Sequence, residues 1–83
     1  MPESRQVAAD LAQVLALLVD QPEQLDVRSV PMRRATVFEV ETAAEDVGQV
    51  IGRRGRTIRA LRTLLDCRGE VDRAQYGLEV LDE

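Results

Sequence analysis

The sequence predicts one two-layer α+β domain over residues 1–83, with elements in the order α-β-β-α-α-β and helices on one face of a three-stranded sheet. Two patterns carry this prediction. Short segments alternate apolar and polar residues with the period of two typical of strands, and longer segments repeat apolar residues every three or four positions, as amphipathic helices do. The short chain, with 45% hydrophobic and 31% charged residues, favours a single folded domain with a thin core.

The first predicted helix covers residues 4–19. Ser4 is placed to cap its N-terminus, and Pro22 is expected to stop it soon after its last residue. Its apolar positions have helical spacing, and they are Val7, Leu11, Val14, Leu15 and Leu18. This spacing predicts a helix with one face against the core.

Two strands are predicted next, over residues 25–30 and 35–42, joined by a hairpin connection at residues 31–34. The second strand is rich in β-branched residues, and Phe38 and Val40 are expected to face the core. The polar strand residues fall on the opposite face, and they are Asp26, Arg28, Glu39, Glu41 and, in the last strand, Glu79. One solvated face and one helix-covered face are typical of an antiparallel-rich sheet in a two-layer domain.

The second half of the chain predicts two helices and a strand. A short helix is expected over residues 45–51 and a longer one over residues 56–67, with Gly69 as its end. The core stripe of the longer helix consists of Ile58, Leu61, Leu64 and Leu65. Residues 70–76 give no clear pattern, and residues 77–81 are predicted to form the last strand.

The composition excludes several kinds of chemistry. The chain has no histidine, lysine or tryptophan and one cysteine. Zinc sites built on histidine or several cysteines, histidine-activated nucleophiles and lysine Schiff bases are therefore excluded. No apolar stretch approaches the length of a membrane span, and the first residues do not resemble a signal peptide. We therefore expect a cytoplasmic protein that is not an enzyme, with no cofactor, no metal and no membrane contact.

Charge is distributed unevenly along the chain. The net charge is −4, but residues 48–68 contain six arginines and one acid, which gives +5. Residues 1–27 and 69–83 each contain one arginine and five acids, which gives −4 for each segment. A basic run alone is usually a solvated helix face. This one includes a loop bracketed by glycines, which favours an anion-binding role.

The loop Gly52-Arg53-Arg54-Gly55 separates the two predicted helices of this basic segment. Gly52 stands at a helix end, where a positive φ favours glycine. Without side chains at Gly52 and Gly55, a phosphodiester backbone can approach closely, and free N–H groups at the start of the second helix can donate to phosphate oxygens. Three neighbouring apolar residues could line a groove for bases, and they are Val50, Ile51 and Ile58.

The nine-residue pattern aliphatic-Ile-Gly-x-x-Gly-x-x-Ile between two helices resembles the KH domain, whose G-x-x-G loop clamps about four nucleotides of single-stranded nucleic acid. The element order agrees with the type II arrangement of that fold. The stretches Leu18–Leu25 and Asp46–Leu64 are further similar to the small single-KH proteins of bacteria, the KhpA family. That resemblance implies cytoplasmic RNA binding and a partnership with the larger KH protein KhpB, also called Jag.

Two features depart from the family pattern. Arg53 stands where the family usually has lysine, which keeps the charge but changes the hydrogen-bonding geometry. Residues 68–77 contain two arginines and two acids, and thus no net positive charge, where basic residues are expected, which weakens the case for RNA contacts near the C-terminus.

The predicted RNA site is confined to the basic segment. It comprises Gly48, Val50, Ile51, Gly52, Arg53, Arg54, Gly55, Arg56, Thr57, Ile58 and Arg59. Gly48 has two interpretations, since its lack of a side chain could let helices pack closely or let RNA approach. The function we expect is that of a post-transcriptional regulator or RNA chaperone acting on single-stranded RNA, as a homodimer or a heterodimer with a KhpB/Jag-type protein. The alternative is a protein-interaction subunit with little RNA affinity of its own.

Overall fold

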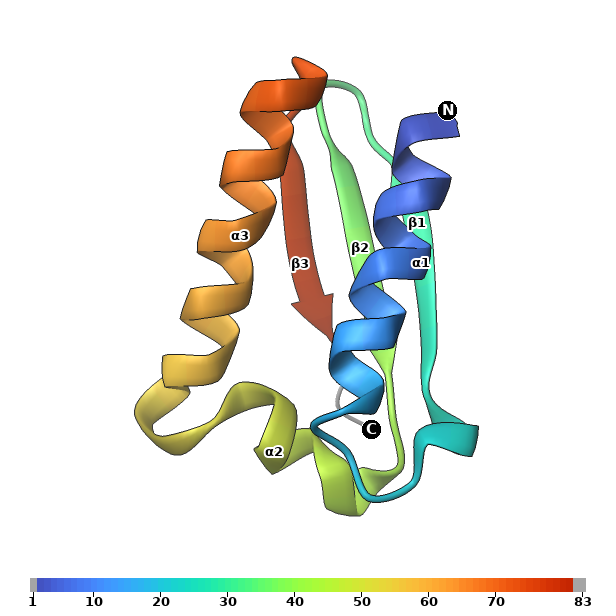
Figure 1. The fold of residues 1–83 in the computed structure, drawn as a ribbon, viewed down its shortest axis with the longest axis vertical. Helices are drawn as coiled ribbons and strands as arrows, with labels where there is room; N and C mark the ends of the chain where they lie inside the picture. The colour runs from blue at the N-terminus through green and yellow to red at the C-terminus, as the bar shows by residue number, and fades with distance from the viewer. Residues whose placement is uncertain (1, 82–83) are drawn as a thin grey trace.

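The computed structural model describes residues 2–81 and contains the predicted elements in the predicted order (Figure 1). Three α-helices and three strands are joined by short turns. Their bounds are α1 Pro2–Ala16, β1 Asp26–Pro31, β2 Thr36–Glu41, α2 Val47–Ile51, α3 Arg56–Asp72 and β3 Tyr76–Val80. Single turns of 3-10 helix occur at Pro22–Gln24, Ala44–Asp46 and Arg53–Gly55. The last of these turns lies within the predicted loop and joins α2 to α3.

The three strands form one mixed sheet in the order β1-β2-β3. Strand β1 pairs antiparallel with β2, and the hairpin between them is closed by the Met32 amide, which donates to the Ala35 carbonyl at 2.7 Å. Strand β3 pairs parallel with β2 after the crossover through α2 and α3. One of the two strand pairings is therefore parallel, whereas the sequence led us to expect mostly antiparallel pairing.

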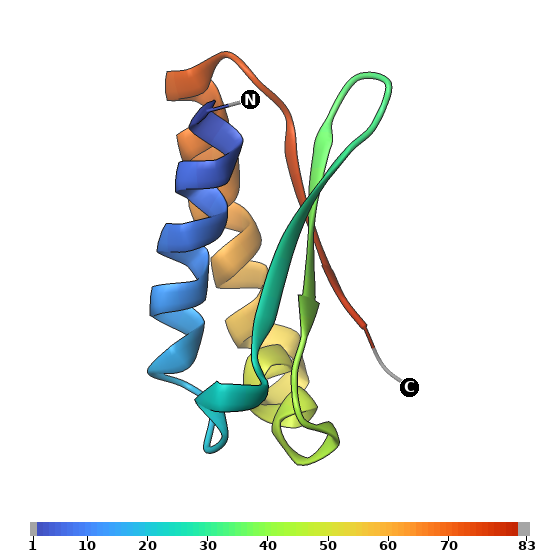
Figure 2. The same cartoon turned by 90° about the vertical axis from the view of Figure 1, so that its right-hand side faces the viewer.

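Helices α1 and α3 cover the same face of the sheet (Figure 2). The core lies between this helical layer and the strands, as the two-layer prediction requires. Phe38 and Val40 are completely buried, which confirms their predicted orientation. The core cluster consists of Val7, Leu11, Leu15, Val19, Phe38, Val40, Val50, Leu61, Leu65, Tyr76 and Leu78.

The opposite face of the sheet is polar, as predicted. Arg28 lies among the acids of β1 and β2, with its guanidinium 3.3 Å from Asp26, 3.8 Å from Glu39 and 3.5 Å from Glu41. These exposed ion pairs add little stability individually. The three carboxylates do neutralise the charge of Arg28. Because they outnumber this arginine, this part of the sheet face has a net negative charge.

Helix α1 begins and ends earlier than the spacing indicates. It starts at Pro2, so that Ser4 lies inside the helix and is buried instead of capping it. The helix ends at Ala16, where the amides of Leu17 and Leu18 donate three residues back, to Val14 and Leu15. These tighter bonds close the last turn. Pro22 therefore does not stop the helix but begins the 3-10 turn that leads to β1.

Helix α3 continues past the glycine that was expected to end it. Gly69 lies in the last turn, and its carbonyl accepts the Ala74 amide at 2.9 Å. A Cβ at Gly69 would lie 2.5 Å from the Ala74 carbonyl oxygen, so glycine is needed for the chain to fold back there. The helix ends instead at Asp72, and Arg73, which follows it, has a left-handed conformation. Leu64 is 61% exposed, so its assignment to the core stripe was wrong.

Candidate nucleic-acid interface

The loop between α2 and α3 has an unusual backbone. Gly52 ends α2 with φ +80° and ψ 169°, and its amide donates to the Gly48 carbonyl at 2.8 Å. Gly55 precedes α3 with φ +73° and a left-handed conformation. Both predicted glycine positions therefore have a positive φ, which L-residues rarely adopt. The loop lies at one end of the molecule, where α2 turns into α3 (Figure 1).

Gly52 is also required because Thr57 packs against it. A Cβ built at Gly52 would lie 2.6 Å from the Thr57 Cβ and 2.8 Å from the Thr57 amide nitrogen, and closer still to the Thr57 hydroxyl. The first turn of α3 therefore lies directly against the end of α2. Thr57 is half-buried in this contact, which gives it a structural role besides the predicted contact with RNA.

Arginine side chains hold and surround the loop. Arg54, at its tip, has φ +56°, a left-handed conformation that is uncommon for a residue with a side chain. Arg59 Nη1 donates to the Arg54 carbonyl at 2.9 Å from one turn along α3. This hydrogen bond supports the strained tip. Arg59, which was predicted as an RNA contact, thus also positions the loop.

The positive charge of this region is not neutralised by the protein. Arg53, Arg54, Arg56 and Arg59 are exposed, and within residues 2–81 none of them forms an ion pair. By contrast, Arg28 and Arg68 are paired with carboxylates. The loop therefore presents four guanidiniums to an incoming anion, and each retains free N–H donors.

The backbone amides at the start of α3 are less available than the sequence indicated. The Gly55 amide donates to the Gly52 carbonyl at 3.0 Å, and the Arg56 amide donates to the Arg53 carbonyl. The amides of Gly52, Gly55 and Arg56 therefore all donate to carbonyls of the chain itself. The amides of Gly55 and Arg56 are therefore not the free N–H groups expected at the helix start, and the donors nearest the tip are those of Arg53 and Arg54.

The apolar residues beside the loop differ in exposure. Val50 is completely buried and belongs to the core, so its side chain offers no surface to a base. Ile51 and Ile58 are half-buried at the edge of the core and do reach the surface. At Gly48 an added Cβ would meet nothing within 4 Å. Close helix packing therefore does not explain this glycine, whereas an approach by RNA remains compatible with the open space.

The contacts of two further residues were not predicted from the sequence. Asp46 is 1% exposed, and its carboxylate accepts the amides of Asp20 at 3.2 Å and Gln21 at 3.0 Å. Arg62 Nη2 donates to the Leu78 carbonyl at 3.3 Å. Both partners are far away in the sequence, so no local spacing could have indicated either contact.

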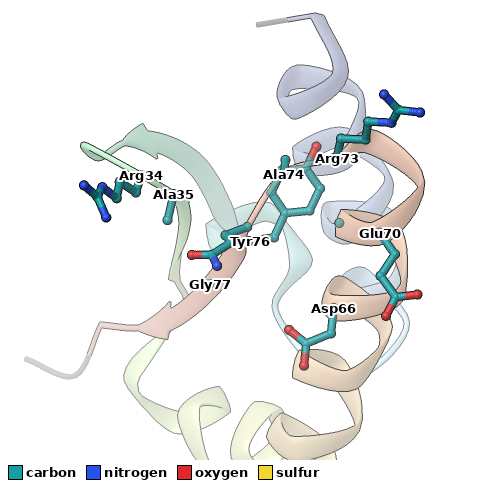
Figure 3. A pocket seen from close by; sticks show the side chains of 10 residues that line it. Arg34, Ala35, Asp66, Glu70, Arg73, Ala74, Tyr76 and Gly77 are labelled. Carbon is teal, nitrogen blue, oxygen red and sulfur yellow. The ribbon is translucent and has the colours of Figure 1, made fainter.

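Hollows of the surface lie at other places. One of about 880 Å³ opens at the far end of α3 between the helix and the start of β3 (Figure 3). Its wall includes Tyr76, whose hydroxyl donates to the Asp72 carboxylate at 2.6 Å. Burial, followed by this contact with the Asp72 carboxylate, raises the pKa of Tyr76 to about 12. A smaller apolar hollow of about 150 Å³ lies between α1 and α3. Neither of these two hollows is lined by residues of the Gly52–Gly55 loop.

Two types of site have no counterpart in the described structure. Among residues 2–81, no group of three histidine, cysteine or carboxylate side chains could hold a metal ion. In the same part of the chain, no helix has the length and apolar character needed to cross a membrane.

Comparison with known proteins gives a consistent result. A family model described as "KhpA/KhpB, KH domain" matches residues 8–80. The RNA-binding protein KhpA of Treponema pallidum is 39% identical over 72 residues, which cover 87% of this chain and 90% of that protein. The protein of the same name from Chlamydia trachomatis is 37% identical over 73 residues, covering 88% and 94%. The one from Streptomyces coelicolor is 48% identical over 52 residues, covering 63% and 66%.

Proposed function

This chain belongs to the KhpA/KhpB family of KH domains, and from that membership and the loop geometry we propose that it binds a short segment of single-stranded RNA. The observation that carries the proposal is the G-x-x-G loop between α2 and α3, with four arginines in and beside it that form no ion pair within residues 2–81. We propose that residues 1–83 act as one KH domain without catalysis or a cofactor. A post-transcriptional regulator or RNA chaperone in the cytoplasm fits this activity.

Phosphates would lie against the tip of the loop. The close approach of an RNA backbone is possible because Gly52 and Gly55 carry no side chains. The amides of Arg53 and Arg54 and the nearby guanidiniums would then donate to phosphate oxygens. Neutralisation of each phosphate on a single strand adds about 0.7 to the slope of log affinity against log salt. Binding should therefore be modest and strongly dependent on salt.

Bases would lie on the surface beside the loop. Ile51 and Ile58 supply its apolar part, and Gly48 leaves space for the strand to pass over α2. About four nucleotides fit such a site in a KH domain. Tyr76 is buried against Phe38, with ring centroids 5.2 Å apart, so it is no stacking platform for a base.

Fluorescence anisotropy with a labelled single-stranded RNA of mixed sequence tests the proposal. The Arg53→Asp/Arg54→Asp variant should lose at least about tenfold in affinity, about 1.4 kcal/mol. Arg33→Asp/Arg34→Asp is the matched control, because it makes the same charge change at the exposed β1–β2 hairpin, at the opposite end of the molecule (Figure 1). Circular dichroism checks that both variants are folded. Equal losses in the two variants would contradict a site at the loop.

A second copy of this chain is the protein partner that we propose. Helix α3 carries an exposed apolar stripe on the side away from the core, formed by Ala60, Leu64, Cys67 and Val71. Its spacing of four, three and four residues is that of a seam between two packed helices. Antiparallel pairing of two α3 helices would bring the arginine-rich N-terminal half of each near the acidic C-terminal half of the other. A KhpB/Jag-type partner could use the same stripe, and a chain that bound RNA only with such a partner would be an interaction subunit.

A further inference from the structure

Strand β3 forms one of the two edges of the sheet, and β1 forms the other. Within residues 2–81, the strand order leaves one side of β3 unpaired, and this side is its free edge. In the parallel pairing, the Thr36 amide donates to the Gln75 carbonyl, and the Leu81 amide donates to the Val40 carbonyl. The odd-numbered residues of β3 therefore turn their backbone groups toward β2. The backbone groups of Leu78, in the middle of the strand, consequently point to the free edge.

Arg62 covers this part of the edge. Its Nη2 donates to the Leu78 carbonyl at 3.3 Å, while the arginine itself is exposed and Leu78 is only 6% exposed. Within residues 2–81 Arg62 has no ion pair, although Asp66 lies four residues later. The guanidinium is thus anchored at one nitrogen, and its other donors are free.

This contact changes the hydrogen-bonding character of the strand edge. An uncovered edge offers one N–H donor and one carbonyl acceptor, a pair that suits the amino and ring-nitrogen groups of adenine or cytosine. When Arg62 donates to the Leu78 carbonyl, this acceptor is occupied. The edge then presents the remaining N–H donors of the guanidinium instead of a carbonyl acceptor. A planar guanidinium pairs best with two adjacent acceptors, such as O6 and N7 of guanine.

We propose that Arg62 makes this chain select a guanine at the edge of β3. The proposal rests on the proposed RNA binding and adds a residue that determines which base is preferred. Arg62 lies six residues after Arg56, about 9 Å along α3, and β3 runs beside the helix (Figure 1). A strand held by its phosphates at the loop can therefore place a base at Arg62.

Randomised seven-nucleotide RNAs with one position fixed as A, C, G or U provide the test. The wild-type chain should prefer guanine at one position by about fivefold or more, the lower end expected of a bidentate pair. Arg62→Ala and Arg62→Lys should lose this preference, the second while keeping the charge. Arg33→Ala removes one exposed arginine at the hairpin and should keep the preference.

A modified base supplies a second readout, which changes the RNA as well as the protein. Replacing the preferred guanine by 7-deazaguanine removes the N7 acceptor, so it should weaken binding to the wild-type chain severalfold and leave Arg62→Ala unaffected. RNA binding without a guanine preference, or a preference that survives in Arg62→Ala, would overturn the role of Arg62 and leave the proposed function standing. A wild-type chain that bound none of these RNAs would refute the proposed function itself.

Discussion

Left-handed backbone is concentrated in the four residues that the motif marks. Gly52, Arg54 and Gly55 all have positive φ, and the other described residue with this property is Arg73 at the end of α3. Such conformations cost free energy and persist where the surroundings determine them. Here Thr57 packs against Gly52, and Arg59 holds the Arg54 carbonyl. The loop is therefore shaped before any ligand arrives, which lowers the ordering cost of binding.

The two loop glycines should differ in their tolerance of alanine. Gly52→Ala combines an unfavourable φ with a clash against Thr57, so we expect it to lower the free energy of unfolding by roughly 2–5 kcal/mol. At Gly55 the nearest atom to a new Cβ is the flexible end of Arg59, at 3.3 Å. Gly55→Ala should therefore cost about 1–2 kcal/mol. Urea denaturation measures the free energy of unfolding of both variants. Equal losses of stability would show that the contact with Thr57 is not the reason why glycine is needed at position 52.

A substitution at Gly48 should change the stability of the fold and the affinity for RNA in opposite directions. An alanine there would enter open space and favour the helix, so Gly48→Ala should raise the free energy of unfolding by up to about 1 kcal/mol. If RNA passes over this position, the same variant should bind RNA several times more weakly. Urea denaturation and anisotropy on one preparation test both expectations. Unchanged RNA affinity would remove Gly48 from the proposed site.

Single side chains join the elements of the helical layer to their neighbours at both ends of the molecule. Asp46, just before α2, accepts two amides from the segment that follows α1. At the other end, the Tyr76 hydroxyl of β3 and Arg68 Nε both donate to Asp72 of α3. These contacts fix the ends of the helical layer over the sheet. They therefore help to position α2 and α3, between which the loop lies.

The Asp46 contact should contribute measurably to stability. Its removal leaves two backbone amides without their charged acceptor in a partly buried place, so Asp46→Ala should lower the free energy of unfolding by about 2–3 kcal/mol. Asp46→Asn, which keeps one acceptor, should cost less. Glu45→Ala is the control, because Glu45 is the exposed neighbour. An equal effect of the Asp46 and Glu45 alanine variants in urea denaturation would contradict this role.

Tyr76 should make the fold sensitive to alkali. Its pKa is raised from 10.0 to about 12 by burial and by its hydrogen bond to the Asp72 carboxylate. The unfolded chain therefore loses this proton at lower pH than the folded one. The stabilisation is fully present below pH 10 and declines by about 2–3 kcal/mol as the pH rises to about 12.

Denaturant titrations across this pH range test the effect on the wild-type chain and Tyr76→Phe. The variant has no phenol to ionise, so its stability should not show the Tyr76-dependent decline. A decline of the same size in both proteins would assign the effect to other groups.

Local periodicity was sufficient to predict the elements but not all of their ends. The alternation around Phe38 and the helical spacing around Leu61 each reflect burial on one side of one element. The end of α1 at Ala16 and the continuation of α3 past Gly69 depend on bonds to later residues. The contacts of Asp46 and Arg62 also depend on distant residues, because their partners are 26 and 16 residues away in the sequence. The loop was predictable because its glycines, arginines and flanking helices are contiguous in the sequence.

Charge is distributed unevenly over the surface of the molecule. The unpaired arginines of the loop lie at one end, and the solvated face of the sheet is acidic around Arg28. A net charge of −4 on the chain opposes indiscriminate binding of nucleic acid and would favour the basic loop as the place where RNA binds, as we propose. A single loop with few contacts gives modest affinity. Two loops in one dimer would raise it through effective concentration, because the second loop binds a strand that the first already holds.

The stripe on α3 should therefore control both assembly and RNA affinity. Leu64 and Val71 are 61% and 77% exposed, so Leu64→Glu should leave the fold intact while placing a charge in the seam of a dimer. Sedimentation equilibrium should show a wild-type mass of twice 9.3 kDa and a variant mass of 9.3 kDa. Met32→Glu, at an exposed apolar residue of the hairpin, should remain dimeric.

The monomeric variant should also bind long RNA more weakly than the wild type, while short RNA that reaches only one loop is bound equally. A wild-type chain that sediments as a monomer would contradict self-association through α3 and direct the search to a different KH partner.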